Sequence, residues 1–263
     1  MKIAIVGAGT MGSAIIESLL REEVFKHDEI MAVDIDGHKL SGLKRRFKIK
    51  TEKSIHDAAE RVDIILLAVK PQSVACVCST FSTDKLIISI LAGVQAKRLK
   101  QLTDSKKIVR VMPNTPAAVG CGVSGWHASK KVTRDEKVMV RKILESFGEQ
   151  AEFKSEKMID VVTAISGSGP AYFFAFAEAL EATAKKMGLG KNAAAFVGET
   201  FFGAAKLADV KEIPFAKLRE DVTSKGGTTA AALEVFQKMK FAKIVEKAAF
   251  AAKKRAEKLA KEN

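Results

Sequence analysis

The chain has 263 residues, of which 47% are hydrophobic and 29% are charged, a balance typical of a folded protein and not of a disordered chain. Its uninterrupted apolar runs fall far short of the roughly 18 residues that a membrane-spanning helix needs, so we expect a cytoplasmic protein with no membrane partner. The net charge of +13 is spread along the sequence and aromatic residues make up 6%, which disfavours nucleic acid as a partner.

Short β-branched runs alternate with polar, helix-forming segments through the first 155 residues. The runs that predict strands cover residues 3–6, 30–33, 62–69, 86–91 and 108–112. This rhythm indicates βαβ units and a parallel sheet that is buried on both faces. Residues 121–127 predict an additional edge strand and residues 132–147 a helix. We therefore expect an α/β fold, with a Rossmann-like, doubly wound and mostly parallel sheet in a dinucleotide-binding domain over residues 1–155.

Strand-like runs end near residue 155, and Ala, Lys, Glu and Phe dominate the remainder of the chain. The pattern predicts helices at 156–187, 191–208, 214–221, 227–238 and 240–261. We expect an all-helical substrate and dimerisation domain over residues 156–263. Residues 172–184 are apolar around most of the helix circumference, more than a half-buried helix requires, which favours a homo-oligomer interface over an ordinary intrachain core.

A glycine-rich segment follows the first predicted strand and opens the first predicted helix. It reads Gly7-Ala8-Gly9-Thr10-Met11-Gly12, the G-x-G-x-x-G pattern of dinucleotide-binding folds. The first glycine permits the tight turn, the second lets the backbone approach a pyrophosphate, and the third lets the helix pack on the strand. The helix N-terminus supplies N–H groups and partial positive charge to the phosphates.

An acidic residue ends the second predicted strand. Asp34 lies 22 residues after Gly12, where a carboxylate accepts hydrogen bonds from the adenosine ribose and repels a 2′-phosphate. The cofactor is therefore expected to be NADH rather than NADPH, with Lys39 as a compensating charge that keeps NADPH open.

Further cofactor contacts are expected where other strands end, because ligands of doubly wound sheets bind at the carboxyl edge. The candidates are Ala68, Val69, Lys70, Pro71, Ala92, Gly93 and Asn114.

Two adjacent glycines between hydroxyl residues precede a helical pattern late in the chain. The segment is Ser224-Lys225-Gly226-Gly227-Thr228-Thr229, and exposed N–H groups at a helix start suit a small carboxylate. The histidines and cysteines have no metal-ligand spacing, so we expect no metal. Cys76, Cys78 and Cys121 are expected to be small buried hydrophobic residues.

Together these segments resemble pyrroline-5-carboxylate reductases, in the same order and over nearly the whole chain. The segments that carry the resemblance are Gly7–Gly12, Ala68–Pro71, Met112–Pro116, Ser166–Tyr172 and Val222–Ala232. The resemblance implies an intertwined homodimer, able to assemble into larger rings, with the active site between one subunit's nicotinamide and helical-domain residues that include those of the partner. It implies that Ser224, Gly226, Gly227 and Thr228 bind the substrate carboxylate and that Thr229 is the catalytic residue, with its hydroxyl near the ring nitrogen.

The sequence departs from the family's pattern at three places. Lys225 replaces a common proline, Asp34 stands where Ser or Asn is frequent, and Ile55 replaces an asparagine that contacts the ribose. Two further assignments stay open. Glu212 is a member of a proton relay or a solvated helix-start residue, and residues 166–170 bind a ligand or re-aim the interdomain helix.

The implied reaction fits these residues chemically. A protonated cyclic imine is already electrophilic, so a hydroxyl that orients its nitrogen, N–H groups that hold its carboxylate and a fixed nicotinamide suffice. One alternative is another Rossmann-plus-helix oxidoreductase, such as a 3-hydroxyacid dehydrogenase. That chemistry needs a general base, usually a lysine, but the helix after residue 170 has none before Lys185. The other alternative is a non-catalytic dinucleotide sensor, which has no need of Ser224–Thr229.

Overall fold

The computed structural model describes residues 1–262, and its contacts divide the chain into two compact units. The sheet unit comprises Met1–Ser168 and Ala251–Asn263, and the helical unit comprises Gly169–Phe250. Each is described by itself.

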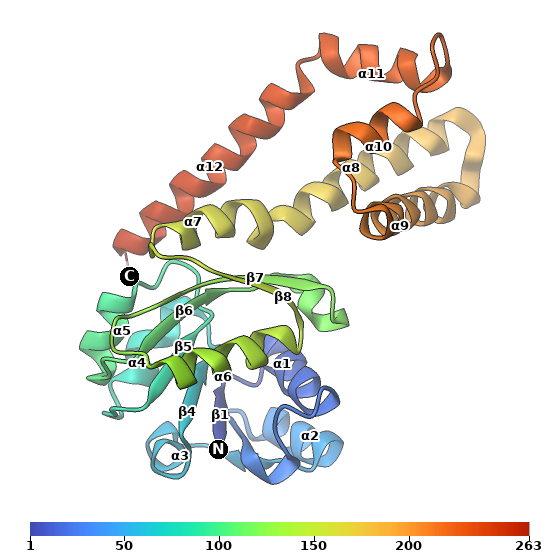
Figure 1. Cartoon of the computed structure of the whole chain (residues 1–263). Helices are drawn as coiled ribbons and strands as arrows, with labels where there is room; N and C mark the ends of the chain where they lie inside the picture. Colours follow the sequence, from blue (N-terminus) through green and yellow to red (C-terminus); the bar gives the residue numbers. More distant parts are fainter. Residues whose placement is uncertain (263) are drawn as a thin grey trace. The chain divides into compact units, whose positions relative to one another are not determined.

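The sheet unit contains an eight-stranded sheet in the order β3-β2-β1-β4-β5-β6-β7-β8 (Figure 1). The strands are β1 (Ile3–Val6), β2 (Ile30–Val33), β3 (Lys50–Glu52), β4 (Ile64–Leu67), β5 (Leu86–Ser89), β6 (Ile108–Met112), β7 (Gly122–Ala128) and β8 (Gly148–Glu152). Neighbouring strands are parallel except β6 and β7. This is the predicted Rossmann-like, mostly parallel sheet.

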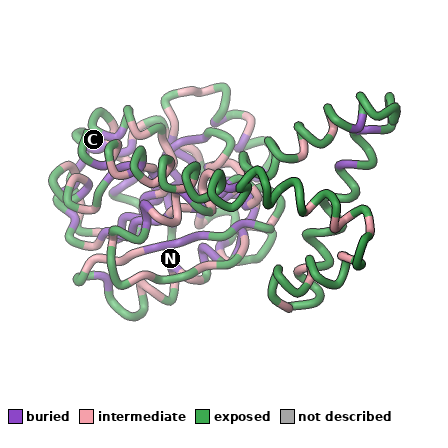
Figure 2. The backbone as a smooth tube through the Cα atoms, turned by 90° about the horizontal axis from the view of Figure 1, so that it is seen from above, coloured by how far each residue is buried: buried purple, intermediate pink, exposed green. Residues whose placement is uncertain are grey.

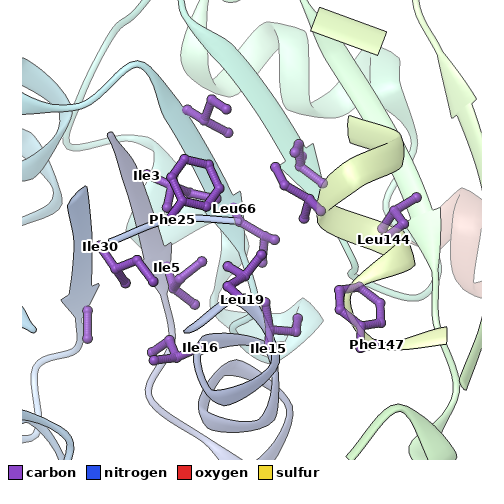
Figure 3. Close-up of a cluster of buried hydrophobic side chains, with 14 of the residues drawn as sticks. Ile3, Ile5, Ile15, Ile16, Leu19, Phe25, Ile30, Leu66, Leu144 and Phe147 are labelled. Carbon is purple, nitrogen blue, oxygen red and sulfur yellow. The ribbon is translucent and has the colours of Figure 1, made fainter. Parts of the chain in front are cut away.

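Alternating side chains of the central strands supply two separate cores, one on each face of the sheet. Ile3 and Ile5 of β1 belong to the first core, whereas Ala4 and Val6 belong to the second. Figure 3 shows part of the first core, where Ile15 and Leu19 of α1 pack near Ile3 and Ile5. Burial on both faces explains why these strands are continuous apolar runs.

Helices pack on both faces of the sheet. The first face carries α1 (Thr10–Arg21), α2 (Gly37–Phe47) and α6 (Arg134–Glu145). The second carries α3 (Ile55–Arg61), α4 (Val74–Cys78) and α5 (Ala96–Thr103). α7 (Met158–Val162) follows β8 and continues into a π-helical turn at Thr163–Gly167.

Two expectations about this unit are wrong. β7 is not an edge strand, because β8 pairs with it in parallel from Gly122↔Gly148 to Trp126↔Glu152. Only one of the three cysteines is buried: Cys78 is, whereas Cys76 and Cys121 are exposed on the short helix α4 and in a loop. Burial raises the pKa of the Cys78 thiol to about 12, so this thiol stays protonated at neutral pH.

The helical unit is made of amphipathic and largely apolar helices. They are α8 (Gly169–Ala184), α9 (Ala193–Lys211), α10 (Phe215–Asp221), α11 (Thr228–Lys238) and the first turns of α12 (Phe241–Glu262). Many of their large apolar side chains are exposed, among them Phe173, Phe174, Phe196 and Phe202, and Figure 2 draws most of these helices as exposed.

One described helical segment, Met158–Lys211, is long and apolar enough to span a membrane by length and composition. The backbone interrupts this segment at Gly188, whose φ of 99° is not helical. Charged residues interrupt its apolar runs, and it meets the criterion by its mean hydropathy. Such a segment is weak support for a membrane protein, because other apolar helices pass the same test.

Candidate functional site

Close backbone packing requires two of the three glycines in the first loop, and the remaining one faces open space. A Cβ on Gly7 (φ +110°) would lie 2.6 Å from the Ala68 carbonyl oxygen, and a Cβ on Gly12 would overlap the Gly7 carbonyl oxygen. A Cβ on Gly9 would meet no atom within 4 Å. α1 begins at Thr10, with Gly9 as an N-cap that makes no side-chain capping bond. The N-terminus of α1 is thus an open cradle that fits a pyrophosphate.

Asp34 ties the end of β2 to this glycine loop. One carboxylate oxygen accepts a hydrogen bond from the Ala8 N–H at 2.8 Å, and the other accepts one from the Asp36 N–H at 2.9 Å. Each oxygen has a second lone pair, so the carboxylate retains the capacity to accept from ribose hydroxyls. The negative charge lies beside the loop, where a 2′-phosphate would be repelled.

The candidates after β4 and β5 lie on the same edge as the glycine loop. Val6 and Leu67 are register partners, and the Ala68 N–H donates to the Val6 carbonyl oxygen at 2.7 Å. The Ile90 N–H donates to the Leu67 carbonyl oxygen at 3.1 Å, which places the chain leading to Ala92 and Gly93 next along the edge. Three of the predicted strand ends are therefore neighbours, as the strand order requires.

Asn114 has an internal partner. Its side chain is buried, and its amide oxygen accepts the Val123 N–H at 2.9 Å, so it fixes the start of β7. Its amide NH₂ group and the second lone pair of its oxygen are left for a cofactor. Ile55, where the family's asparagine was expected, is also buried and packs in the second core.

In the helical unit, the structure brings all five substrate-binding candidates into one turn. Gly226 has a φ of +72°, and Gly227 is the N-cap of α11 without a side-chain capping bond. The Gly227 N–H donates to the Ser224 carbonyl oxygen at 3.1 Å, and a Cβ on Gly227 would overlap the Ser224 hydroxyl. Thr229 is half-buried, whereas Ser224 and Thr228 are exposed. This open helix start fits a small carboxylate.

Glu212 and Ser166, two candidates outside these loops, lie at a helix end and in a helical turn. Glu212 is the left-handed C-cap of α9, with a φ of 50°. The Ser166 hydroxyl donates to the Val162 carbonyl oxygen at 3.1 Å within the π-helical turn. A ligand role for either residue stays a prediction.

The sequence reasoning missed two residues near the cofactor loops. Ile35 directly follows Asp34 and is 90% exposed, and an apolar residue between two aspartates after a strand was the available signal. Arg110 is 3% exposed within β6, and an arginine in an otherwise apolar strand was the signal there. Among residues 1–262, no group of three or more His, Cys, Asp or Glu side chains has the arrangement of a metal site.

Two family models match the chain. The model described as pyrroline-5-carboxylate reductase dimerisation matches residues 156–259, and the model described as NADP oxidoreductase coenzyme F420-dependent matches residues 2–93.

Curated relatives and solved structures match nearly the full length. The pyrroline-5-carboxylate reductase of Haemophilus influenzae is 40% identical over 94% of this chain and 93% of its own, and that of Escherichia coli is 35% identical over 99% and 98%. The structure of a Coxiella burnetii pyrroline-5-carboxylate reductase has a TM-score of 0.91 at 32% identity, covering 98% of both chains. A Plasmodium falciparum pyrroline carboxylate reductase with NADP bound has a TM-score of 0.85 at 30% identity, covering 99% of this chain and 98% of its own. The chain belongs to the pyrroline-5-carboxylate reductase family.

Proposed function

We propose that the chain reduces 1-pyrroline-5-carboxylate to L-proline by hydride transfer from NAD(P)H, the last step of proline biosynthesis, in the cytoplasm. Family membership and the helix start at Ser224–Thr229 support this reaction together. The helix start is the observation that carries the proposal, because a dinucleotide sensor needs the glycine loop but has no use for a second anion cradle.

Different residues of this turn bind the carboxylate and the ring nitrogen of the substrate. Backbone N–H groups at the start of α11 and the Ser224 hydroxyl hold the carboxylate, and the positive end of the helix dipole favours its charge. The Thr229 hydroxyl orients the ring nitrogen. The exposed Lys225 adds a cation beside the carboxylate.

The cofactor supplies the hydride that adds to the carbon of the C=N bond. The chain's part is to hold the cofactor: the open N-terminus of α1 takes the pyrophosphate, and the residues at Ala68–Pro71, Ala92–Gly93 and Asn114 border the edge where the nicotinamide half is expected. The exposed Ile35 offers an apolar surface for the adenine ring.

We infer that NADH is preferred and that NADPH is accepted. The charge of Asp34, fixed beside the loop by Ala8 and Asp36, supports a preference for the unphosphorylated ribose. Lys39 is paired loosely with Asp36 at 3.8 Å and is exposed, so it remains available to a 2′-phosphate. The Plasmodium falciparum relative that binds NADP supports acceptance of NADPH.

Residues 156–263 act as the substrate and dimerisation domain in this proposal, and residues 1–155 as the dinucleotide-binding domain. The exposed phenylalanines of the helical unit and its match to the dimerisation model support a homodimer, from which larger rings assemble. A second copy, not lipid, then covers the apolar surface of α8 and α9.

The decisive experiment follows oxidation of NADH and of NADPH at 340 nm with 1-pyrroline-5-carboxylate as substrate. We expect turnover with both cofactors and a higher kcat/KM with NADH. Cofactor binding without turnover would support the sensor hypothesis, and turnover of a 3-hydroxyacid instead of the imine would support the dehydrogenase alternative.

A further inference from the structure

An ion cluster around one buried arginine lies in the sheet unit, on the strand that leads to Asn114. Arg110 of β6 is 3% exposed, and its Nη1 lies 2.8 Å from Glu156 Oε1. Its Nη2 lies 3.9 Å from Asp160 Oδ1 in α7. Removing a buried arginine from water costs far more free energy than an exposed ion pair returns, so this placement calls for a reason other than stability.

The cluster connects three segments that end at the cofactor edge. Glu156 Oε1, which accepts from Arg110, also accepts the Ala96 N–H at 2.8 Å. Ala96 begins α5, and the loop before it contains Ala92 and Gly93. Asp160 lies in α7, one turn before the π-helical turn. Arg110 therefore contacts two residues of the segment after β8, and one of them, Glu156, also accepts the N–H of the first residue of α5.

Alternation along β6 strengthens this connection. Arg110 and Met112 lie on the same face of the strand, and a Cβ on Gly167 would lie 2.7 Å from Met112 Cε. Gly125 of β7, the register partner of Met112, is equally close to α7, since a Cβ there would lie 2.5 Å from Val162 Cγ2. α7 and the π-helical turn thus pack closely on β6 and β7, with glycines at the contact positions. Pro113 and Asn114 directly follow β6 on this side.

The charges around Asp160 favour a cation at position 110. Burial raises the pKa of the Asp160 carboxyl, Glu257 and Glu156 raise it further, and Arg110 and Lys253 oppose them. Asp160 therefore faces two other carboxylates and two cations. Lys253 and Glu257 come from α12 and pair with each other, and Lys157 and Lys261 also act on Glu257. Without Arg110, Glu156 and the mostly buried Asp160 would repel each other, and they would move apart or Asp160 would take up a proton.

We propose that Arg110 is a positioning residue for the reductase: through Glu156 and Asp160 it fixes the loop after β5 and the start of α7 relative to the end of β6, and so sets the shape of the nicotinamide half of the cofactor site. The expected effect on kcat rests on the proposed function. The expected effect on NADH binding rests only on the dinucleotide-binding fold.

The test compares Arg110→Met, Arg110→Lys and Glu156→Gln with the unmodified chain. Arg110→Met keeps the length of the side chain and removes both ion pairs, and Glu156→Gln keeps an acceptor for Ala96 and removes the charge. We expect Arg110→Met to weaken NADH binding, measured by nucleotide fluorescence, about 10-fold and to lower kcat as well, since a displacement near 1 Å is costly in a positioned site. Arg110→Lys, which restores one charged contact, should recover part of both losses.

The matched control is Lys107→Met. Lys107 directly precedes the same strand, and its Nζ pairs with Glu136 Oε1 at 2.8 Å, so this variant also breaks an ion pair held by β6 but at the end away from the cofactor edge. We expect unchanged NADH affinity and kcat in Lys107→Met.

Wild-type NADH affinity and wild-type kcat per folded site in Arg110→Met would overturn the proposal and leave Arg110 a purely structural role. If Arg110→Met is insoluble, Glu156→Gln takes its place as the test. Wild-type NADH affinity in Glu156→Gln would also overturn the proposal. Absence of imine turnover in the unmodified chain would refute the proposed function instead, and the NADH-binding comparison would still test the positioning role.

Discussion

At the scale of single residues, Thr229 has the most specific chemical assignment in the proposed reaction. We expect Thr229→Ala to lower kcat/KM about 10- to 100-fold, the scale of one lost positioning hydrogen bond, when the oxidation of NADH is followed with 1-pyrroline-5-carboxylate. Thr229→Ser keeps the hydroxyl and should retain most of the activity.

Thr223→Ala is the matched control for this change. The Thr223 hydroxyl donates to the Arg219 carbonyl oxygen at 2.6 Å, so it already has a partner at the end of α10. Equal losses in Thr223→Ala and Thr229→Ala would indicate a shared effect on the turn and would remove Thr229 from the mechanism.

Asp34 is the residue on which the proposed cofactor preference depends. Asp34→Ser removes the charge that opposes a 2′-phosphate and keeps a hydroxyl at the end of β2, so we expect kcat/KM to shift toward NADPH relative to NADH. The shift should come from the KM of each cofactor. An unchanged ratio of the two kcat/KM values would mean that this carboxylate serves only the Ala8 and Asp36 N–H groups.

At the scale of elements, the two ends of the glycine loop provide a matched pair of substitutions. Gly12→Ala places a methyl group against the Gly7 carbonyl oxygen, so we expect it to reduce the free energy of unfolding by about 3 kcal/mol, as overpacking does in a rigid core. Gly9→Ala adds a methyl group in open space at an ordinary φ of −80° and should change stability by less than about 0.5 kcal/mol.

Gly9→Ala, which should leave stability nearly unchanged, is expected to weaken cofactor binding. Gly9→Ala occupies the space where the pyrophosphate is expected to meet the backbone, so the NADH dissociation constant should rise in this stable variant. Urea unfolding and nucleotide fluorescence measure the two effects separately. Wild-type NADH affinity in Gly9→Ala would show that the N-terminus of α1 is not the phosphate site.

The elements that could be predicted are those whose own residues specify them. β1, β2 and β6 are short apolar runs, and they were located to the residue because burial on both faces demands such runs. β3 and β8 were missed. Their sequences, KTE and GEQAE, contain almost no apolar residues, and these strands exist because β2 and β7 offer free backbone edges. The missed β8 also explains why β7 was wrongly expected at the edge.

The candidate site shows the same division. The glycine loop and the turn before α11 could be predicted because their geometry is local, as the φ values of Gly7 and Gly226 demonstrate. The cluster around Arg110 could not be predicted, because it depends on contacts between segments distant in the sequence. The partner of Asn114 lies only nine residues along the chain, but it depends on how the chain turns between β6 and β7. Glu156 lies 46 residues from Arg110, and no local pattern links the two.

At the scale of the whole molecule, the exposed apolar surface of the helical unit bears on the assembly. Phe202 of α9 is 66% exposed, and we expect Phe202→Glu to convert the dimer into monomers in sedimentation velocity, because an unpaired charge in an apolar interface is costly. Val138→Glu is the control, since Val138 is 42% exposed on α6 of the sheet unit and should leave the assembly unchanged. A persistent dimer in Phe202→Glu would place the interface elsewhere.

The path of the chain has a consequence for engineering. Because Ala256 and Ala260 at the end of α12 are buried with the first 168 residues, residues 169–250 form an insertion whose two ends are both anchored in the same host. Deleting residues 169–250 and joining Ser168 to Ala251 through a flexible linker should therefore yield a smaller protein that still binds NADH. Truncating the chain from its carboxyl terminus would instead remove the buried Ala256 and Ala260 from the sheet unit.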